Sequence, residues 1–114
     1  MSADCLFCRM ASGEIPVPKV HEDDLVFAIR DINPQAPTHV LVMPVAHVPS
    51  AAALTDADGP LLARLFSVAA RIAAGDGLEA GWRLVSNVGP DGGQTVPHLH
   101  VHLLGGRPMA WPPG

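Results

Sequence analysis

The segment His98-Leu99-His100-Val101-His102-Leu103-Leu104 alternates histidine with apolar residues, and this alternation constrains the fold more than any other feature of the chain. Because successive side chains of a strand point to opposite faces, the segment predicts a strand over residues 97–104. Three imidazoles should line one face of this strand, while Leu99, Val101 and Leu103 should enter a core on the other. The chain therefore needs a sheet that packs on one face and presents histidines on the opposite face.

The three histidines admit three interpretations. They could be ordinary side chains on a solvated face, although strict alternation is not the expected scatter of six histidines in this chain. Alternating histidines of a strand can also ligate a catalytic Zn²⁺ ion. Alternatively, a neutral imidazole can attack as a nucleophile while its neighbours orient it or handle protons.

A glycine-rich segment over residues 86–95 ends just before the first of these histidines. Glycine lets the backbone approach a ligand closely, and a turn of free N–H groups suits a phosphate. On its own the segment could equally be a plain hairpin turn. Beside three histidines it is better explained as a phosphate-binding turn, which favours nucleophilic catalysis over the other two interpretations.

The rest of the chain supplies the other elements of a two-layer α+β domain. Residues 33–37 carry two prolines and must form a loop. Thr55 and Asp58 predict the start of a long helix that ends near Gly75 and Gly77. Short connections between strands predict an antiparallel sheet with this helix on one face. We expect a short helix over residues 5–12 and further strands over residues 25–32, 39–43 and 82–88.

The composition indicates one globular domain over residues 1–114 and excludes several classes of partner. Apolar residues make up 48% of the chain, which is enough for a packed core. The net charge is −4 and there is no basic run, so we expect no nucleic-acid partner. No stretch approaches the ~18–20 apolar residues of a membrane span. Residues 1–5 lack the pattern of a secretory signal, so we expect a cytoplasmic protein with no membrane partner.

These motifs together resemble the histidine-triad (HIT) superfamily, and within it the Hint branch of purine nucleoside phosphoramidases. The resemblance covers nearly the whole chain and rests on residues 13–16, 31–39, 91–94, 98–104 and 111–114. It implies a HIT-like α+β fold, with about five antiparallel strands, one short helix and one long helix. It also implies a homodimer in which the sheets of the two subunits join.

The resemblance assigns the catalytic roles. His100 would be the nucleophile that attacks the α-phosphorus of a nucleotide, and the backbone carbonyl of His98 would accept the Nδ1–H of His100. His102 would contact the phosphate, and His39 resembles a fourth family histidine on a neighbouring strand. The hydroxyl of Thr95 would act near the leaving group.

The same resemblance implies the nucleotide-binding residues. Asp31 would take the ribose hydroxyls, and His100 and His102 would adjoin the phosphate. The segment that contacts the phosphate and the leaving group would include Asn87, Gly93, Gln94 and Thr95. The apolar slot around the base would be formed by Leu6, Phe7, Ile29, Ile32 and Leu41, for which core packing is the alternative explanation.

Two positions depart from the family pattern. Thr95 stands where animal Hint proteins commonly have Ser, and its extra methyl group restricts rotation of the side chain. Ala110 stands where animal members commonly have His, in a tail that reaches toward the partner subunit's site in the family. Both differences bear on the choice of leaving group and substrate.

The segment Cys5-Leu6-Phe7-Cys8 places two cysteines one helical turn apart. Such a pair can bind a metal, pack as free thiols or perform redox chemistry, but the last use needs a preceding strand that this chain lacks. The resemblance implies structural zinc, because members with this pair complete a Cys₂His₂ site. The ligands here would be Cys5, Cys8, His47 and His98.

The function implied is hydrolysis of a purine nucleoside monophosphate derivative, of the phosphoramidate type, through a covalent nucleotidyl-histidine. No cofactor is required for this chemistry. The alternatives are a dinucleotide polyphosphate hydrolase of a sister branch, and a nucleotide sensor or adaptor without catalysis. The intact set of His39, His98, His100 and His102 favours an enzyme, and the tail over residues 111–114 favours the Hint branch.

Overall fold

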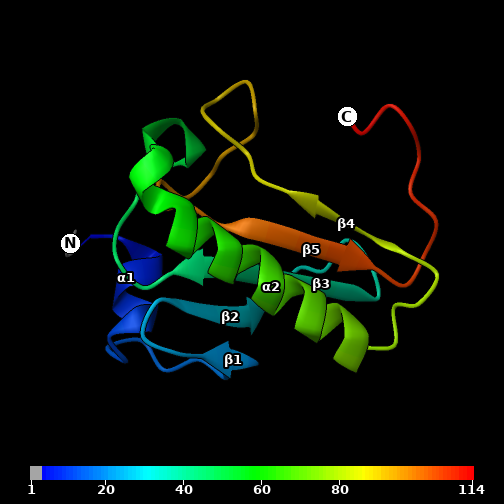
Figure 1. The fold of residues 1–114 in the computed structure, drawn as a ribbon, viewed down its shortest axis with the longest axis horizontal. Coiled ribbons are helices and arrows are strands. Elements are labelled where there is room, and N and C mark those ends of the chain that lie inside the picture. Colours follow the sequence, from blue (N-terminus) through cyan, green and yellow to red (C-terminus); the bar gives the residue numbers. More distant parts are fainter. Residues whose placement is uncertain (1–3) are drawn as a thin grey trace.

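A computed structural model describes residues 4–114 of the chain, and over these residues one five-stranded antiparallel sheet carries a long helix on one face (Figure 1). The strand order is β1-β2-β3-β5-β4, so β3 lies at the centre and β1 and β4 form the edges. The elements are α1 (Leu6–Ala11), β1 (His21–Glu22), β2 (Val26–Arg30), β3 (Thr38–Pro44), η1 (Ala51–Ala53), η2 (Asp56–Asp58), α2 (Gly59–Gly75), β4 (Trp82–Val85) and β5 (Val101–Gly105). The predicted α+β arrangement is confirmed.

The central strand β3 is buried along its whole length because it has a core on each face. Val40 and Val42 point into a core shared with α2, while Leu41 and Met43 point into a second core that includes residues of α1. The alternation of side chains thus divides β3 between two layers. The core on the α1 side is the one that the histidines adjoin.

The strand predicted over residues 97–104 is wrong in its first half, because β5 begins only at Val101. The register pairs Val42 with Val101, which would bring Pro44 opposite Leu99. Proline has no N–H to donate to a ladder, and the N–H of Leu99 bonds instead to the carbonyl of Val48. The alternation of faces persists nevertheless, since Leu99 and Leu103 both enter the α2 core.

Other boundaries also differ from prediction. β4 ends at Val85 and not near residue 88, because the hydroxyl of Ser86 donates to the carbonyl of His100 where a ladder bond would form. β2 begins at Val26 and not at residue 25, where the Asp23 carboxylate accepts the N–H groups of Leu25 and Val26, and it ends at Arg30, two residues earlier than predicted. β3 extends one residue beyond its predicted range at each end. The two-residue strand β1 was too short to predict from a pattern.

The long helix α2 ends where the sequence predicts, but it begins at Gly59, so the prediction that Thr55 caps it is wrong. Thr55 caps the short 3₁₀ helix η2 and forms a capping box with Asp58, and α2 follows directly with Pro60 in its first turn. The helix ends at Gly75, and Gly77 then adopts a positive φ of 73°. None of the helices formed by residues 4–114 is long and apolar enough to cross a membrane.

Two glycines at the end of β5 allow unusually close approaches of other segments. A Cβ atom at Gly105 would lie 2.6 Å from Cδ1 of Leu78, which belongs to the connection between α2 and β4. A Cβ atom at Gly106, whose φ is +91°, would lie 2.8 Å from Cβ of Pro37 in the loop between β2 and β3. The chain therefore leaves β5 in contact with both segments.

Candidate active site and metal centre

The imidazole of His100 is buried and bonds to the backbone through Nδ1. Its Nδ1 lies 2.7 Å from the backbone carbonyl oxygen of His98. Because a carbonyl oxygen only accepts, Nδ1 carries the proton and Nε2 of the neutral ring keeps its lone pair. The edge of the Phe7 ring packs against this imidazole at a centroid distance of 5.2 Å. His100 is thus held in the tautomer that a nucleophile needs.

His102 lies beside His100 and offers an unused nitrogen atom. Its Nδ1 is 2.9 Å from Nε2 of His39, whereas its own Nε2 is buried and has no hydrogen-bond partner among residues 4–114. Burial, followed by the nearby imidazoles of His100 and His39, lowers the pKa of His102 from 6.5 to about 4. The ring is therefore neutral near pH 7, and a buried polar atom without a partner is the feature expected where a ligand binds.

The ring of His98 lies against the two cysteines. Its Nδ1 lies 3.2 Å from Sγ of Cys5 and 3.5 Å from Sγ of Cys8. Nε2 of His98 lies 2.8 Å from the carbonyl oxygen of Pro44 and must donate to it. Nδ1 consequently presents a lone pair to the two sulfur atoms, which is the form of histidine that binds a metal.

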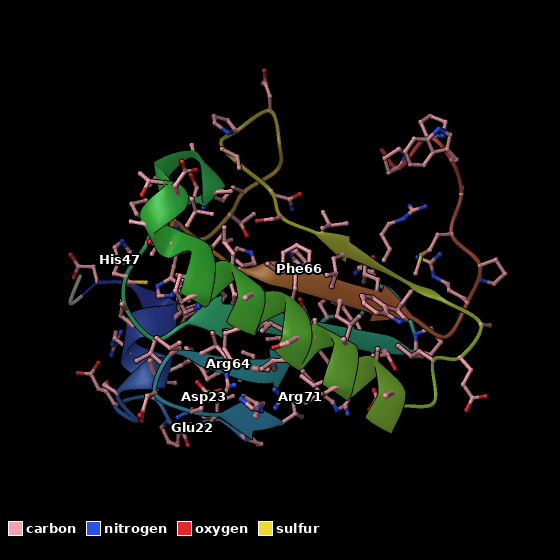
Figure 2. All side chains as sticks on the ribbon, viewed as in Figure 1. Glu22, Asp23, His47, Arg64, Phe66 and Arg71 are labelled. Atoms are coloured by element: carbon pink, nitrogen blue, oxygen red, sulfur yellow. The ribbon has the colours of Figure 1, made fainter. Side chains whose placement is uncertain are left out.

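The fourth member of this cluster is His47, whose Nδ1 lies 3.3 Å from Sγ of Cys8. His47 adjoins the N-terminal end of α1 (Figure 2). The four donor atoms of Cys5, Cys8, His47 and His98 all lie within 4.8 Å of one another. Two sulfurs and two imidazole nitrogens form the donor set of a closed tetrahedral zinc site, and the bond from His98 to Pro44 is the outer support that such ligands have.

A second convergent group consists of Asp31, His39 and His102, but its hydrogen bonds oppose metal binding. The backbone N–H of Gln35 lies 3.0 Å from Nδ1 of His39 and can only donate to it. The proton of a neutral His39 therefore sits on Nε2, the very atom that would ligate the metal. Over residues 4–114, no convergent group contains His98, His100 and His102 together, so the geometry does not form a catalytic three-histidine zinc site.

The structure brings three of the five predicted base-slot residues to the histidines. Phe7, Ile29 and Leu41 are buried in the core on the α1 side, and Leu41 pairs directly with His102 across β3 and β5. Leu6 is 41% exposed and Ile32 is fully exposed, so these two lie at the surface of the chain. Core packing alone explains why Phe7, Ile29 and Leu41 are buried, and core residues beside the histidines can also contact a base.

Asp31 lies near the histidines at the end of β2. Its Oδ2 is 3.5 Å from Nε2 of His39, and its Oδ1 accepts the backbone N–H of Asn33. The carboxylate is 20% exposed, so one of its oxygens can still receive a ligand donor. This position is compatible with the ribose contact that the resemblance implies.

The glycine-rich turn is shaped by Gln94. The side-chain oxygen of Gln94 accepts the N–H of Gly89, and its amide nitrogen donates to the carbonyls of Pro49 and Val96. These bonds use the side chain to brace the turn. The backbone N–H groups of Gly93 and Gln94 donate to the carbonyls of Pro90 and Gly89, so the expectation that the N–H groups of this turn are free is wrong for these two.

The other predicted residues of this turn are available at its surface. Gly93 has a positive φ of 80°, which favours glycine. Asn87 is half-buried and Thr95 is exposed. Neither of these two side chains makes a hydrogen bond within the described part of the chain.

Sequence reasoning missed the backbone groups that set the protonation of the histidines. A backbone carbonyl is common to all residues and a backbone N–H to all except proline, so side-chain identity cannot reveal the roles of Pro44 and Gln35. Only the tertiary contacts of Pro44 with His98 and of Gln35 with His39 reveal these roles.

An imidazole with a free Nε2 lone pair, beside a neutral histidine whose Nε2 has no partner among residues 4–114, suits covalent catalysis on an anionic group. The chain belongs to the HIT family: residues 12–109 match the family model described as the HIT domain. It is 44% identical over 110 residues to the purine nucleoside phosphoramidase of Escherichia coli K12, with 96% of this chain and 92% of that protein covered. The family and the HIT-like fold predicted from the sequence are thus confirmed.

Two further proteins are similar along most of their length. The 14 kDa zinc-binding protein of Zea mays is 48% identical over 111 residues, which cover 96% of this chain and 87% of that one. A HIT family hydrolase of Legionella pneumophila Philadelphia 1 matches with a TM-score of 0.95 and 52% identity, over 97% of this chain and all of that structure.

Proposed function

We propose that this chain is a hydrolase of purine nucleoside 5′-phosphoramidates that forms a covalent nucleotidyl-histidine on His100. The observation that carries the proposal is the bond between Nδ1–H of His100 and the carbonyl of His98. It leaves the lone pair of Nε2 free, on a buried ring, beside an N–H that can bind a phosphate oxygen. The similarity to a purine nucleoside phosphoramidase supports the substrate class.

The reaction follows in two displacements at phosphorus. Nε2 of His100 attacks the α-phosphorus, the P–N bond of the substrate breaks, and the amine leaves after it takes up a proton from solvent. Water then attacks the same phosphorus, the bond to Nε2 breaks, the water returns a proton to solvent, and a nucleoside monophosphate is released. In both steps Nε2–H of His102 would stabilise the charge on a non-bridging phosphate oxygen.

The remaining residues would bind the nucleoside and the leaving group. The carboxylate of Asp31 would accept the ribose hydroxyls, while Phe7, Ile29 and Leu41 would line the apolar slot for the base. Thr95, with its exposed hydroxyl, would lie near the leaving group together with Asn87 and the backbone of Gly93 and Gln94.

The zinc site would support the fold and take no part in the reaction. All four of its positions are filled by protein atoms from Cys5, Cys8, His47 and His98, so no position remains for an activated water. The similarity to a zinc-binding protein is consistent with this assignment.

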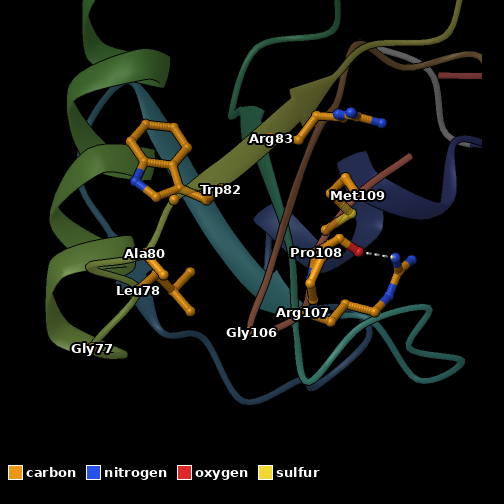
Figure 3. A pocket seen from close by; sticks show the side chains of 10 residues that line it. Gly77, Leu78, Ala80, Trp82, Arg83, Gly106, Arg107, Pro108 and Met109 are labelled. Atoms are coloured by element: carbon orange, nitrogen blue, oxygen red, sulfur yellow. Dashed lines mark hydrogen bonds between the residues drawn. The ribbon is translucent and has the colours of Figure 1, made fainter. Parts of the chain in front are cut away.

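We also propose that the protein is a homodimer whose sheets join along β4. This strand is an edge of the sheet, and an unpaired edge is normally covered. Trp82 on β4 is 41% exposed, and Phe66 on α2 is 54% exposed (Figure 2). A hollow of about 540 Å³ also lies here and not at the histidines, between Trp82 and the segment that includes Met109 (Figure 3).

The decisive experiment compares two substrates and traps the intermediate. Adenosine 5′-phosphoramidate should be hydrolysed faster than a diadenosine polyphosphate, and a rapid quench in alkaline denaturant, which preserves the P–N bond to histidine, should show a chain heavier by one adenylyl group. His100→Ala should lose both the adduct and turnover while it still binds AMP. Faster cleavage of the polyphosphate would favour the dinucleotide hydrolase, and binding without turnover by the unaltered protein would favour a sensor.

A further inference from the structure

A chain of hydrogen bonds with fixed direction runs from the loop between β2 and β3 to the catalytic face. The backbone N–H of Gln35 can only donate, so Nδ1 of His39 accepts. The proton of neutral His39 is then on Nε2 and is donated to Nδ1 of His102. The proton of His102 is left on Nε2, the buried atom that has no partner among residues 4–114.

The start of this chain is held in place by Arg107, which follows β5. Nε and Nη2 of Arg107 donate to the carbonyl oxygen of Gln35 at 3.2 and 3.0 Å. Nη1 donates to the carbonyl of Pro108, so the guanidinium is fixed at both ends (Figure 3). Gly106 makes this approach possible, because its backbone conformation and lack of a Cβ let the chain turn against Pro37.

We propose that Arg107 and the backbone N–H of Gln35 are positioning groups that hold His102, through His39, in the tautomer with its proton on Nε2. The inference rests on the proposed function for one point only, namely that the atom bound by Nε2–H is a phosphate oxygen. The side-chain amide of Gln35 takes no part in this chain of hydrogen bonds, because it donates to the carbonyl of Asn33.

The opposite arrangement shows why the direction matters. If His39 carried its proton on Nδ1, two N–H groups would face each other at 3.0 Å across the contact with Gln35. Nε2 of His39 would then accept from Nδ1–H of His102, and Nε2 of His102 would present a lone pair to the substrate. A lone pair repels an anionic oxygen, so this tautomer would disfavour a bound phosphate. The Asp31 carboxylate, 3.5 Å from Nε2 of His39, also favours a proton on that atom.

The tautomers can be measured directly in ligand-free protein by long-range ¹H–¹⁵N correlation of the imidazole rings. We expect both His39 and His102 to carry the proton on Nε2. Gln35→Pro removes the N–H and should move part of the His102 population to the Nδ1–H form. The matched control Gln35→Ala keeps the N–H, removes only the side-chain amide, and should leave both tautomers unchanged.

Binding and kinetics separate this role from a general loss of structure. In Gln35→Pro we expect kcat/KM for adenosine 5′-phosphoramidate and the affinity for AMP to fall by about ten-fold or more. The affinity for adenosine, which has no phosphate, should stay the same. Arg107→Ala should shift the same three readouts in the same direction by a smaller factor, and Arg107→Lys should restore part of the loss. Arg107→Ala also provides the test if Gln35→Pro does not fold.

Two results would overturn the proposal: an Nδ1–H tautomer of His102 in the unaltered protein, or unchanged tautomers and AMP affinity in both Gln35→Pro and Arg107→Ala. Failure of the proposed function looks different. In that case the tautomers would be as expected, but the unaltered protein would hydrolyse no phosphoramidate.

Discussion

Nε2 of His98 lies 2.8 Å from the carbonyl oxygen of Pro44, and this single contact determines what the other side of the ring can do. Because the proton must point at the carbonyl, Nδ1 is a bare acceptor that faces Cys5 and Cys8. The same residue uses its own carbonyl to orient His100. His98 therefore connects the cluster of Cys5, Cys8 and His47 to His100, through its ring on one side and its backbone carbonyl on the other.

Purified protein should carry about one zinc ion per chain in this closed site. A strong chelator should lower the free energy of unfolding, because metal binding adds to folding stability, whereas mild chelation should leave hydrolysis intact. His47→Gln removes the one histidine ligand that lies outside the triad and should abolish zinc binding. The check is elemental analysis with thermal unfolding. Loss of activity in parallel with zinc, at unchanged fold, would show that the metal is catalytic.

Asp31→Asn should weaken nucleotide binding by roughly 10–100-fold, as expected when a charge-assisted hydrogen bond of about 1.5–3 kcal/mol is lost. The amide oxygen of Asn can still accept the N–H of Asn33, so the local turn should survive. Calorimetric titration with AMP measures the effect. A 2′,3′-dideoxy nucleotide should bind both proteins equally, and a full-sized difference with that ligand would remove Asp31 from the ribose site.

His102 should make stability depend on pH in a defined direction. Its pKa is lowered to about 4 in the folded chain, from 6.5, mainly by burial. Between these values the unfolded state binds the proton and the folded state does not, so stability is complete above pH 6.5 and falls as the pH drops toward 4. From pH 7.5 to pH 5 the loss should be on the order of 1–2 kcal/mol. In denaturant titrations, His102→Gln should lack this part of the loss, and equal pH slopes in the two proteins would contradict the assignment.

Trp82→Arg should convert a homodimer into a monomer, because it places a charge beside the free edge of β4. Sedimentation velocity at micromolar concentration provides the measurement. The control is Leu25→Arg, which alters an equally exposed apolar residue on the β1 side of the sheet and should leave the dimer intact. If the unaltered protein sediments as a monomer, the joined sheets are ruled out.

The sequence predicted the layers of this fold better than the ends of its strands. Alternation placed Leu99 and Leu103 in the core correctly, because side-chain direction is a local property. It could not show that β5 starts at Val101, since that boundary depends on Pro44, a residue far away in the sequence. Strand β1 has only two residues and is defined by its partner β2 alone.

The candidate site, like the fold, could be predicted only in part from the sequence. The spacing of the histidines pointed to nucleophilic chemistry, and the family resemblance named Cys5, Cys8, His47 and His98 together, a set that the structure brings into one cluster. The resemblance also implied that the carbonyl of His98 accepts the Nδ1–H of His100, and the structure has that contact. The protonation of the other rings was beyond sequence reasoning, because it depends on the carbonyl of Pro44 and the N–H of Gln35, whose positions follow from tertiary packing.

The close approach of Gly106 to Pro37 has a consequence for protein engineering and for the divergence of relatives. The tail after β5 and the loop between β2 and β3 touch where neither has room for a larger residue. A chimera that takes its tail from another family member would have to take residues 33–37 from the same donor. These two segments lie some seventy positions apart in the chain. We expect that a chimera which replaces only one of them folds less well than a chimera which replaces both.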